Sequence, residues 1–344
     1  PRQGRRRHCQ HRKLMVYNKM INSFDIIGDI HGYAGKLLEL LLKLGYKEQA
    51  GCFRHRDRKA IFLGDLIDRG PENFKTVEIV KAMVDRERAL VVMGNHEYNA
   101  LCYHTKDRNG DSIRKHSEKN SGQHKTVLAE IAAGGKEKWR GYLEWFRRMP
   151  LFLEIGGIRI VHASWDQDTI KFLGGAASPA DGSGRLTDEF IYESYQEFTP
   201  CFDAVETLLK GKEIPLPDGF PGILDKDGNL RRKVRLKWWL PGEQLREACT
   251  YDQVARINEN SLKKLAGIKI PGRVLEELKA EANREQALDN DSPVFFGHYW
   301  FTGEPRLLTR NAACLDYSVA RGGKLVCYRW DGEKILDKSK FVYV

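Results

Sequence analysis

Two neighbouring stretches of the chain decide its fold, FDIIGDIHG at residues 24–32 and AIFLGDLIDRG at residues 60–70. Each begins with residues typical of a buried β-strand, turns at a glycine, and then presents carboxylate or imidazole side chains. A helical pattern follows each stretch, at about 35–44 and 71–88, and a third strand is expected at 89–93. Strands that alternate with helices of this length predict a βαβ arrangement.

The later part of the chain predicts further strands, separated by a long insertion. Strands at 151–155 and 158–161, joined by two glycines, predict a hairpin, and the strands resume at 293–296. The segment between them, 166–292, is far longer than the dozen or so residues that a crossover between parallel strands requires. We therefore expect an inserted, mainly helical cap at 166–292.

The two ends of the chain have a simple expected organisation. Segment 1–22 carries many Arg, His and Lys residues without apolar periodicity, which predicts a flexible basic arm ahead of a single domain at 23–344. At the other end, apolar runs at 305–308, 312–315 and 324–329 predict a terminal antiparallel meander.

Composition narrows the class of protein. Hydrophobic residues make up 41% of the 344 residues, which is enough for a sizeable core and excludes a disordered chain. No apolar run approaches the roughly 18 residues of a membrane span, so we expect no membrane partner. The seven cysteines lack the two-residue spacing of a zinc or redox motif, which predicts free thiols and a cytoplasmic location. The net charge of +10 favours acidic partners, either phosphorylated substrates or nucleic acid bound through the basic arm.

Five of the expected strands end in a turn that presents side chains of the kind that bind metal ions. Glycine lets the backbone turn sharply as it leaves a sheet, and ligands of α/β sheets bind outside the carboxyl ends of the strands. The five endings are therefore expected to meet at one rim. Together they supply oxygen and nitrogen donors for two ions that share a bridging carboxylate. The candidate ligands are Asp29, His31, Asp65, Asn95, His162 and His298.

In chain order, the motifs are GDIHG at 28–32, GDLIDRG at 64–70, GNHE at 94–97, a strand-end histidine at 162 and GH at 297–298. This series resembles the metallophosphoesterases of the calcineurin-like phosphoprotein phosphatase superfamily, which includes the symmetrical bis(5′-nucleosyl)-tetraphosphatases. The resemblance covers about 24–103, 151–165 and 293–330. It implies an α/β fold, a four-layer α/β/β/α sandwich with two mixed sheets.

The resemblance also implies which residues hold metal. One ion would be held by Asp29, His31 and Asp65, and the other by Asp65, Asn95, His162 and His298. The implied cofactor is a pair of divalent metal ions. We expect Mn²⁺, although the donor types suit iron or zinc almost equally.

Three further residues have implied catalytic roles. His96 would be the general acid, because an uncoordinated imidazole beside the metals can protonate the leaving oxygen. Asp68 would hold the other ring nitrogen of His96 and so fix its tautomer. Arg69 would clamp the phosphate with its planar guanidinium.

Two departures bear on the substrate. The phosphoprotein phosphatases of this superfamily carry Arg where this chain has Met93, and two glycines where it has Ala163 and Ser164. Both changes weaken the assignment as a protein phosphatase. The segments 313–316 and 322–325 resemble the nucleotide hydrolases instead.

Three functions remain open at this point. The expected function is metal-dependent hydrolysis of phosphomonoesters, including phosphoserine and phosphothreonine in proteins. The alternative within enzymes is a bis(5′-nucleosyl)-tetraphosphatase that acts on dinucleoside polyphosphates. The alternative of another class is a nucleic-acid-binding protein with a vestigial site.

A basic run inside the insertion offers a candidate substrate-binding surface. Its arginines could attract the extra phosphates of a polyphosphate, and its tryptophans could stack on a nucleobase. The other interpretation is that packing tryptophans lie beside a solvated basic strand. The residues are Arg231, Arg232, Arg235, Trp238 and Trp239.

Overall fold

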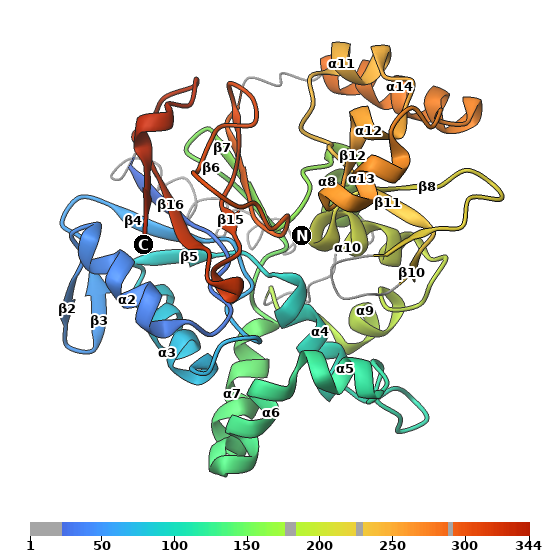
Figure 1. Ribbon diagram of the computed structural model, residues 1–344. Helices are drawn as coiled ribbons and strands as arrows, with labels where there is room; N and C mark the ends of the chain where they lie inside the picture. The colour runs from blue at the N-terminus through green and yellow to red at the C-terminus, as the bar shows by residue number, and fades with distance from the viewer. Residues whose placement is uncertain (1–22, 176–183, 225–229, 288–291) are drawn as a thin grey trace, which may run out of the picture.

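The computed structural model describes residues 23–175, 184–224, 230–287 and 292–344. The predicted basic arm at 1–22 lies outside the described residues. Two mixed sheets form the framework of the described chain (Figure 1). The predicted α/β class with two mixed sheets is confirmed.

The first sheet has the order β15-β16-β1-β4-β5, and β17 also pairs with β16. Strands β1, β4 and β5 are parallel, whereas β16 is antiparallel to β1, β15 and β17. Helices α2 (Ala34–Lys43) and α3 (Asn73–Asp85) follow β1 and β4, as the sequence predicts. The strands are β1 (Phe24–Ile27), β4 (Lys59–Phe62), β5 (Ala89–Val91), β15 (Asp316–Tyr317), β16 (Lys324–Trp330) and β17 (Phe341–Tyr343).

The second sheet has the order β14-β13-β7-β6. Strands β14, β13 and β7 are parallel, and β6 and β7 form the predicted antiparallel hairpin. The two glycines between β6 and β7 have positive φ angles, which a tight turn of this kind requires. The strands are β6 (Phe152–Ile155), β7 (Ile158–Val161), β13 (Val294–Phe296) and β14 (Ala312–Cys314).

The predicted terminal meander is wrong. Segment 305–308 forms no strand, and the backbone amide of Leu308 bonds to the carbonyl of Ala312 instead. Strand β14 then pairs in parallel with β13, and the chain crosses to the first sheet before β15. The sequence pattern gives apolar strands in the right places, but it does not tell which sheet each one joins.

The two sheets pack face to face through buried aromatic rings. Phe295 of β13 lies 5.0 Å from Tyr328 of β16, measured between ring centroids. Because successive residues of a strand point to opposite faces, Phe296 points away from the first sheet. There its ring lies 4.8 Å from Trp238 and 5.3 Å from Trp239 of the insertion. The insertion therefore covers the outer face of the second sheet.

Between β5 and β6 the chain forms a group of helices next to the sheets (Figure 1). A kink at Gly134, where φ is 103°, lies within η1 and separates α6 from α7. A short hairpin of β2 (Lys47–Gln49) and β3 (Cys52–Arg54) lies between α2 and β4. The helices are α4 (Asn95–His104), α5 (Glu118–Gln123), α6 (Lys125–Glu130), η1 (Ile131–Gly135) and α7 (Lys136–Phe146).

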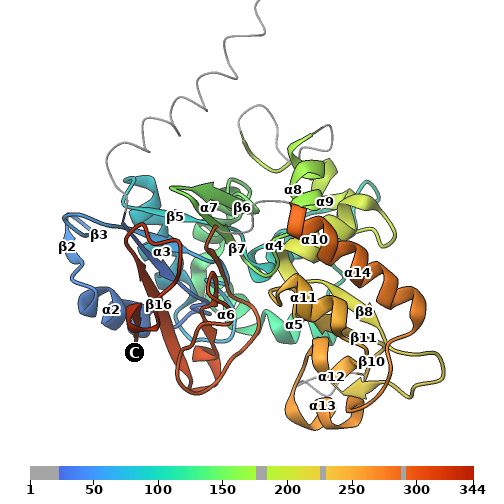
Figure 2. The same cartoon turned by 90° about the horizontal axis from the view of Figure 1, so that it is seen from above.

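The segment between β7 and β13 forms a separate mass beside the sheets, drawn in yellow and orange (Figure 2). Its helices are α8 (Gln167–Gly174), α9 (Asp188–Glu193), α10 (Pro200–Lys210), α11 (Gly242–Glu247), α12 (Tyr251–Val254), α13 (Glu259–Leu265) and α14 (Gly272–Ala287). Its short strands are β8 (Glu213–Pro215), β9 (Ile223–Leu224), β10 (Leu230–Arg231), β11 (Lys233–Leu236) and β12 (Ala255–Arg256).

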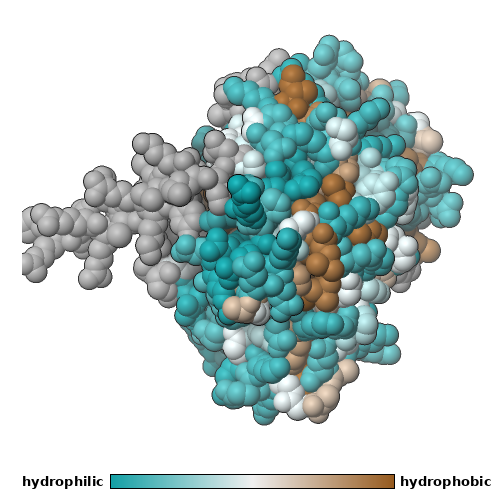
Figure 3. Space-filling view, turned by 90° about the vertical axis from the view of Figure 1, so that its left-hand side faces the viewer, coloured by the Kyte–Doolittle hydropathy of each residue, from teal (hydrophilic) through white to brown (hydrophobic). Residues whose placement is uncertain are grey.

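The face of the molecule shown in Figure 3 is mostly hydrophilic, with hydrophobic residues in a broken band. Large apolar side chains are exposed on separate elements of the described chain, as at Leu42, Phe198 and Ile335. Among the helices that the structure describes, none is long and apolar enough to cross a membrane.

Candidate metal centre

The six predicted ligands lie at one rim, where strands of both sheets end; we call this set the metal rim. The first sheet contributes the residues that follow β1, β4 and β5, and the second sheet contributes those that follow β7 and β13. All six are buried, although five of them carry an ionisable imidazole or carboxylate group and lie close to one another. In chain order they are Asp29, His31, Asp65, Asn95, His162 and His298.

The first group of metal-binding atoms consists of His31, Asp65 and His96, whose donor atoms lie within 4.8 Å of one another. Nε2 of His31 is 3.6 Å from Oδ2 of Asp65. The other ring nitrogen of His31, Nδ1, is 3.1 Å from the carbonyl oxygen of Ile67. Since a carbonyl only accepts, Nδ1 carries the proton there, and the lone pair of Nε2 faces the carboxylate, as in a metal-ligating histidine.

The second group consists of Asp65, His162 and His298, again within 4.8 Å. Nε2 of His162 is 3.4 Å from Oδ1 of Asp65, while its Nδ1 donates to the carbonyl of Leu63 at 2.7 Å. The amide oxygen of Asn95 lies 3.1 Å from Nε2 of His162 and 2.8 Å from Nδ1 of His298. Asp65 thus presents one carboxylate oxygen to each group, which is the arrangement of a ligand that bridges two ions.

Asp29 shows that the rim suits a cation. Its Oδ2 accepts a hydrogen bond from the backbone amide of His298 at 3.1 Å. Its Oδ1 is buried and has no hydrogen-bond donor among the described residues. Burial, followed by the nearby charge of Asp316, raises the pKa of Asp29 well above its usual value. A divalent ion would satisfy this oxygen and favour the ionised carboxylate, so the residues present fit a metal.

The charges of the rim are strongly coupled. Burial raises the pKa of Asp65, but His162 and His96 outweigh burial and hold it well below the usual range. Burial lowers the pKa of His162, yet Asp65 raises it to about 10. His31 differs, since burial lowers its pKa to about 4. The centre of the rim therefore favours positive charge, which divalent ions would supply in place of an imidazolium.

The loops of the rim adopt an uncommon backbone conformation. His31, Asp65, Asp68, Arg69 and His298 all have positive φ angles, between 49° and 73°. Side chains other than glycine rarely adopt this region, and such strain persists only where the surrounding structure holds the residue in place. Its concentration here indicates a rigidly built site.

Glu97 anchors these loops, a role that the sequence analysis missed. Its carboxylate accepts hydrogen bonds from the backbone amides of Asp65 and Leu66, both at 2.8 Å, and of Gly94 at 3.1 Å. Burial, with the charge of Asp65, raises its pKa to about 7. Close approach of the loops also requires Gly64, because a Cβ there would lie 2.3 Å from the nitrogen of Gly94. The sequence feature that could have indicated this role is the GNHE motif, because Glu97 is its final residue.

The structure brings His96 and Asp68 together, and adds a second histidine. Nδ1 of His96 lies 2.6 Å from Oδ2 of Asp68. Nδ1 of His124 lies 2.7 Å from the other oxygen, Oδ1. Burial raises the pKa of Asp68, but the two histidine hydrogen bonds lower it to about 2. None of the sequence motifs includes His124.

Arg69 is exposed, next to the buried Asp68. The pKa of His96 is raised: burial lowers it, Asp65 and Asp68 raise it, and the charge of Arg69 acts against them. The same guanidinium charge lowers the pKa of His31, after the larger effect of burial. Arg69 is therefore close enough to the rim to interact with both histidines.

The three arginines predicted to bind substrate do not lie in one shared environment. Arg231 and Arg232 are exposed, and Arg232 donates to the carbonyl of Phe220 at 2.9 Å. Arg235 instead donates to the carbonyl of Lys210 at 3.0 Å, and its guanidinium lies 5.2 Å from the centre of the Trp300 ring. The structure thus separates Arg235 from its two exposed neighbours.

The two tryptophans of the insertion pack inside the protein. Trp238 and Trp239 are only 6% and 8% exposed. Nε1 of Trp238 donates to the carbonyl of Ala163 at 3.0 Å, and Trp239 packs edge to face on Tyr299 at 4.9 Å. Their rings are covered by other aromatic side chains, so the expectation that either one stacks on a nucleobase is corrected in favour of packing.

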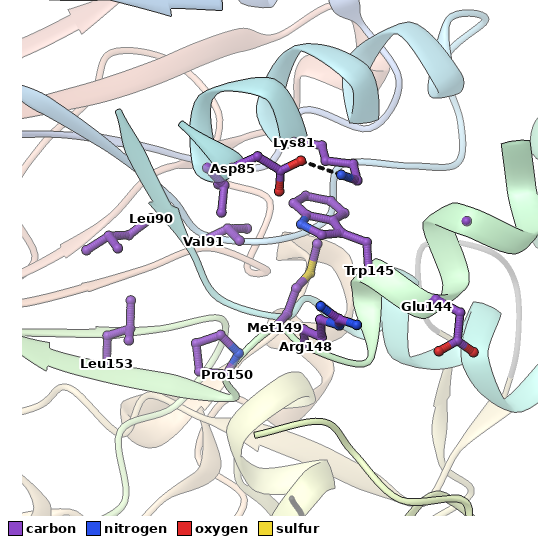
Figure 4. A pocket seen from close by; sticks show the side chains of 12 residues that line it. Lys81, Asp85, Leu90, Val91, Glu144, Trp145, Arg148, Met149, Pro150 and Leu153 are labelled. Atoms are coloured by element: carbon purple, nitrogen blue, oxygen red, sulfur yellow. Dashed lines mark hydrogen bonds and ion pairs between the residues drawn. The ribbon is translucent and has the colours of Figure 1, made fainter. Parts of the chain in front are cut away.

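A cavity of about 570 Å³ lies away from the rim, between the ends of α3, β5, α7 and β6 (Figure 4). Its lining includes Leu90, Trp145 and Met149, together with the ion pair of Lys81 and Asp85. None of the predicted site residues lines it. The cavity and the metal rim are therefore separate sites.

Curated relatives match part of the chain. A protein of Oceanobacillus iheyensis, named bis(5′-nucleosyl)-tetraphosphatase PrpE (asymmetrical), is 33% identical over 144 residues, which is 40% of this chain and 54% of the relative. The protein of that name from Anoxybacillus flavithermus is 31% identical over 153 residues, 43% of this chain and 59% of the relative. The chain therefore spans little more than half the length of these relatives.

Two solved phosphatase structures align with most of the chain. A protein serine/threonine phosphatase from Saccharomyces cerevisiae is 12% identical, with a TM-score of 0.41, over 97% of this chain and 86% of the other. A cold-active protein-tyrosine phosphatase from a Shewanella species is 15% identical, with a TM-score of 0.41, over 91% of this chain and 79% of the other. Scores of this size support no argument about the chain.

A family model matches more than half of the chain. It covers residues 23–244 and is described as calcineurin-like phosphoesterase. The matched range includes β1, β4, β5 and β7, which carry all of the metal rim except His298. The chain belongs to the calcineurin-like phosphoesterase family.

Proposed function

We propose that the chain is a metal-dependent phosphoesterase that hydrolyses phosphoesters at the metal rim. The single observation that supports this most is the position of Asp65, whose two oxygens each face a separate group of buried donors. Asp29, His31 and Asp65 would hold one divalent ion, and Asp65, Asn95, His162 and His298 the other. Two ions about 3.5–4 Å apart lower the pKa of water and neutralise phosphate oxygens.

His96 is proposed as the general acid. Its Nδ1 is engaged by the ionised Asp68, so the proton available for transfer is on Nε2, which lies 3.9 Å from Oδ2 of Asp65. In the reaction, the N–H bond at Nε2 breaks as an O–H bond forms on the leaving oxygen, and solvent returns the proton to His96. The exposed Arg69 is proposed to bind phosphate oxygens in bidentate fashion.

We propose that the insertion at 166–292 acts as a cap that selects the substrate. The support is its contact with the residues that immediately follow two of the ligands. Trp238 bonds to Ala163, after His162, and Arg256 donates to the carbonyl of Tyr299, after His298, at 2.9 Å. These contacts hold the insertion beside the metal rim, where it can contact the leaving group of a substrate.

The substrate class is proposed in two forms. The first candidate is phosphomonoesters, including phosphoserine and phosphothreonine in proteins, and its support is the arrangement of the metal rim. Dinucleoside polyphosphates are the second candidate, supported by Met93 in place of the arginine of protein phosphatases and by the names of the curated relatives. Mn²⁺ as the metal and a cytoplasmic location stay predictions.

A vestigial site in a nucleic-acid-binding protein has less support. A site no longer in use would be expected to lose ligands, whereas all six donors are present and buried together. Binding to plain duplex that weakens steeply with salt, without any hydrolysis, would favour that alternative.

The test is a substrate panel on enzyme with a defined metal content. An aryl phosphate, a phosphoserine peptide and a dinucleoside tetraphosphate would be assayed with Mn²⁺, with Zn²⁺ and after chelation. We expect hydrolysis that is lost on chelation and restored by metal. Hydrolysis at an unchanged rate in the chelated protein would contradict the proposal.

A further inference from the structure

The carboxylate of Asp68 is held from two sides by histidines of different origin. His96 is the second residue of α4 and belongs to the GNHE motif, whereas His124 lies between α5 and α6, outside every motif of the sequence. Their Nδ1 atoms lie 2.6 Å and 2.7 Å from the two oxygens of Asp68. All three side chains are buried. They line a small pocket of about 10 Å³ together with their neighbours, which is room for about one water molecule.

The direction of both hydrogen bonds follows from the charge of Asp68. An ionised carboxylate can only accept, so each histidine donates its Nδ1 proton to it. The pKa of Asp68, lowered to about 2 by these two bonds against the effect of burial, agrees with an ionised group. His124 therefore acts on the same carboxylate as His96, but through the other oxygen.

His124 is itself fixed on every side. Its second ring nitrogen, Nε2, lies 3.3 Å from Nε2 of His104, so both nitrogens are engaged and the ring cannot turn over freely. The rings of Tyr103 and Trp139 lie 5.4 Å and 5.5 Å from it. Its backbone amide bonds to the carbonyl of Ser121 at 3.1 Å. Apart from its bond to Asp68, the His124 ring is therefore held by residues of α4 and α7.

Asp68 needs such an anchor more than an ordinary carboxylate does. Its backbone has φ of 69° and the next residue has φ of 73°, both in the left-handed region. A residue in that region is held there only by its surroundings. A carboxylate bound at one oxygen can rotate about its last torsion, whereas one bound at both oxygens is fixed in plane and direction.

We propose that His124 is a positioning residue for the general acid. It holds Oδ1 of Asp68, so that Oδ2 is fixed where it accepts the hydrogen bond from Nδ1 of His96. This bond orients the His96 ring so that its Nε2 points toward the leaving oxygen. This rests on the proposed function, in which His96 donates that proton. His124 itself touches neither substrate nor metal.

The kinetic test compares leaving groups on the metal-loaded enzyme. His124→Ala should lower kcat by about 10–100-fold for phenyl phosphate, by analogy with the loss of groups that orient a ligand. The loss should be smaller for p-nitrophenyl phosphate, whose leaving oxygen needs less protonation, and KM should change little. His124→Asn should restore most of the loss, because the amide Nδ2 can donate from nearly the same place. Equal losses on both substrates, or no loss, would overturn the proposal.

A double variant separates positioning from a general effect on folding. If His124 acts through His96, then His96→Ala with His124→Ala should be no slower than His96→Ala alone. A further loss of the full His124→Ala factor in the double variant would overturn the proposal. Lys119→Ala is the control, since this exposed lysine lies on α5, the helix that ends next to His124.

A measurement without turnover distinguishes this inference from the proposed function. The Nδ1 proton of His96, bonded to Asp68, should give a low-field NMR signal that shifts in His124→Ala and returns in His124→Asn. A signal that does not move in His124→Ala would overturn the positioning role even if the enzyme is active. Conversely, a shifted signal in a protein that hydrolyses no phosphoester would support the positioning and contradict the function.

Discussion

The metal rim and the basic segment of the insertion, residues 231–237, are both rich in polar side chains, but the structure treats them in opposite ways. The rim gathers residues from five strands, far apart in the sequence, into buried groups whose donor atoms lie within 4.8 Å. The basic segment is continuous in sequence, yet its arginines separate in space, with Arg232 exposed and Arg235 partly buried under Trp300.

Two kinds of sequence signal therefore differ in how well they locate a site. A residue directly after a parallel strand is placed by the sheet, because the strand fixes where its end lies. A run of charges on a short strand is placed by whatever the neighbouring loops contact. Polar residues that directly follow several parallel strands are therefore better support for a site than polar residues that are merely adjacent in the sequence.

The largest expected effect comes from the residue that both donor groups share. Asp65→Asn should remove at least one metal and nearly all turnover, because a neutral amide cannot bridge two cations as a carboxylate does. Elemental analysis with a turnover assay measures both. Asp57→Asn, at an exposed carboxylate that precedes β4 and so lies at the other end of the strand from Asp65, should retain both. Two metals at normal activity in Asp65→Asn would mean that the two groups are not one site.

The next effect separates the acid from the ligands of the rim. His96→Ala should keep both metals but lower kcat by on the order of 10²–10⁴ for a poor leaving group. The loss should be smaller for an activated aryl phosphate. Although His96 belongs to the first donor group, a variant that binds two metals and loses rate in this selective way would identify it as the acid. Loss of a metal would make it a ligand instead.

A stability effect of moderate size is expected at Asp68. Its pKa is about 2 in the folded protein, against about 3.9 in an unfolded chain. As the pH falls, the unfolded chain takes up the proton first, so the ionised carboxylate stabilises the fold above pH 4 and loses this contribution between about pH 4 and pH 2.

Asp68→Asn should therefore lower the free energy of unfolding by on the order of 2 kcal/mol at pH 7, and by less at pH 3. Urea unfolding at both values measures the difference. A difference that is the same at pH 7 and pH 3 would show that the charge of Asp68 is not what stabilises the fold.

The smallest effect tests the basic segment. Changing Arg231 and Arg232 to Ser should raise KM for a dinucleoside tetraphosphate by less than about fivefold, since exposed charges contribute little and are screened by salt. Arg235→Ser should raise it more, because this guanidinium lies on Trp300, whose ring is 5.7 Å from that of His298. KM values at low and high salt provide the measurement. A larger rise in KM for the Arg231 and Arg232 variant than for Arg235→Ser would instead indicate that the two exposed arginines bind the substrate.

The sequence could predict the parts of the site that a strand places directly. Asp29, Asp65 and His162 follow strands that are easily recognised as apolar runs in the sequence, so the sequence alone predicts that they lie at one rim. His124 could not be predicted in this way, because its contact with Asp68 depends on how α5 and α6 fold back beside α4. The sequence left open whether Trp238 packs inside the protein or stacks on a substrate, because its burial depends on the outer face of the second sheet, where its ring lies 4.8 Å from Phe296.

The metal rim also draws its donors from both sheets, and this has a mechanical consequence. Asp65 belongs to the first sheet and His162 to the second, and their side chains approach to 3.4 Å. An ion held by both would be a cross-link between the two layers, at the edge where the ligand-bearing strands of both sheets end. Because binding to the docked state alone stabilises it by mass action, metal occupancy would report whether the sandwich is closed. Chelation should then loosen the seam between the sheets while each sheet keeps its own hydrogen bonds.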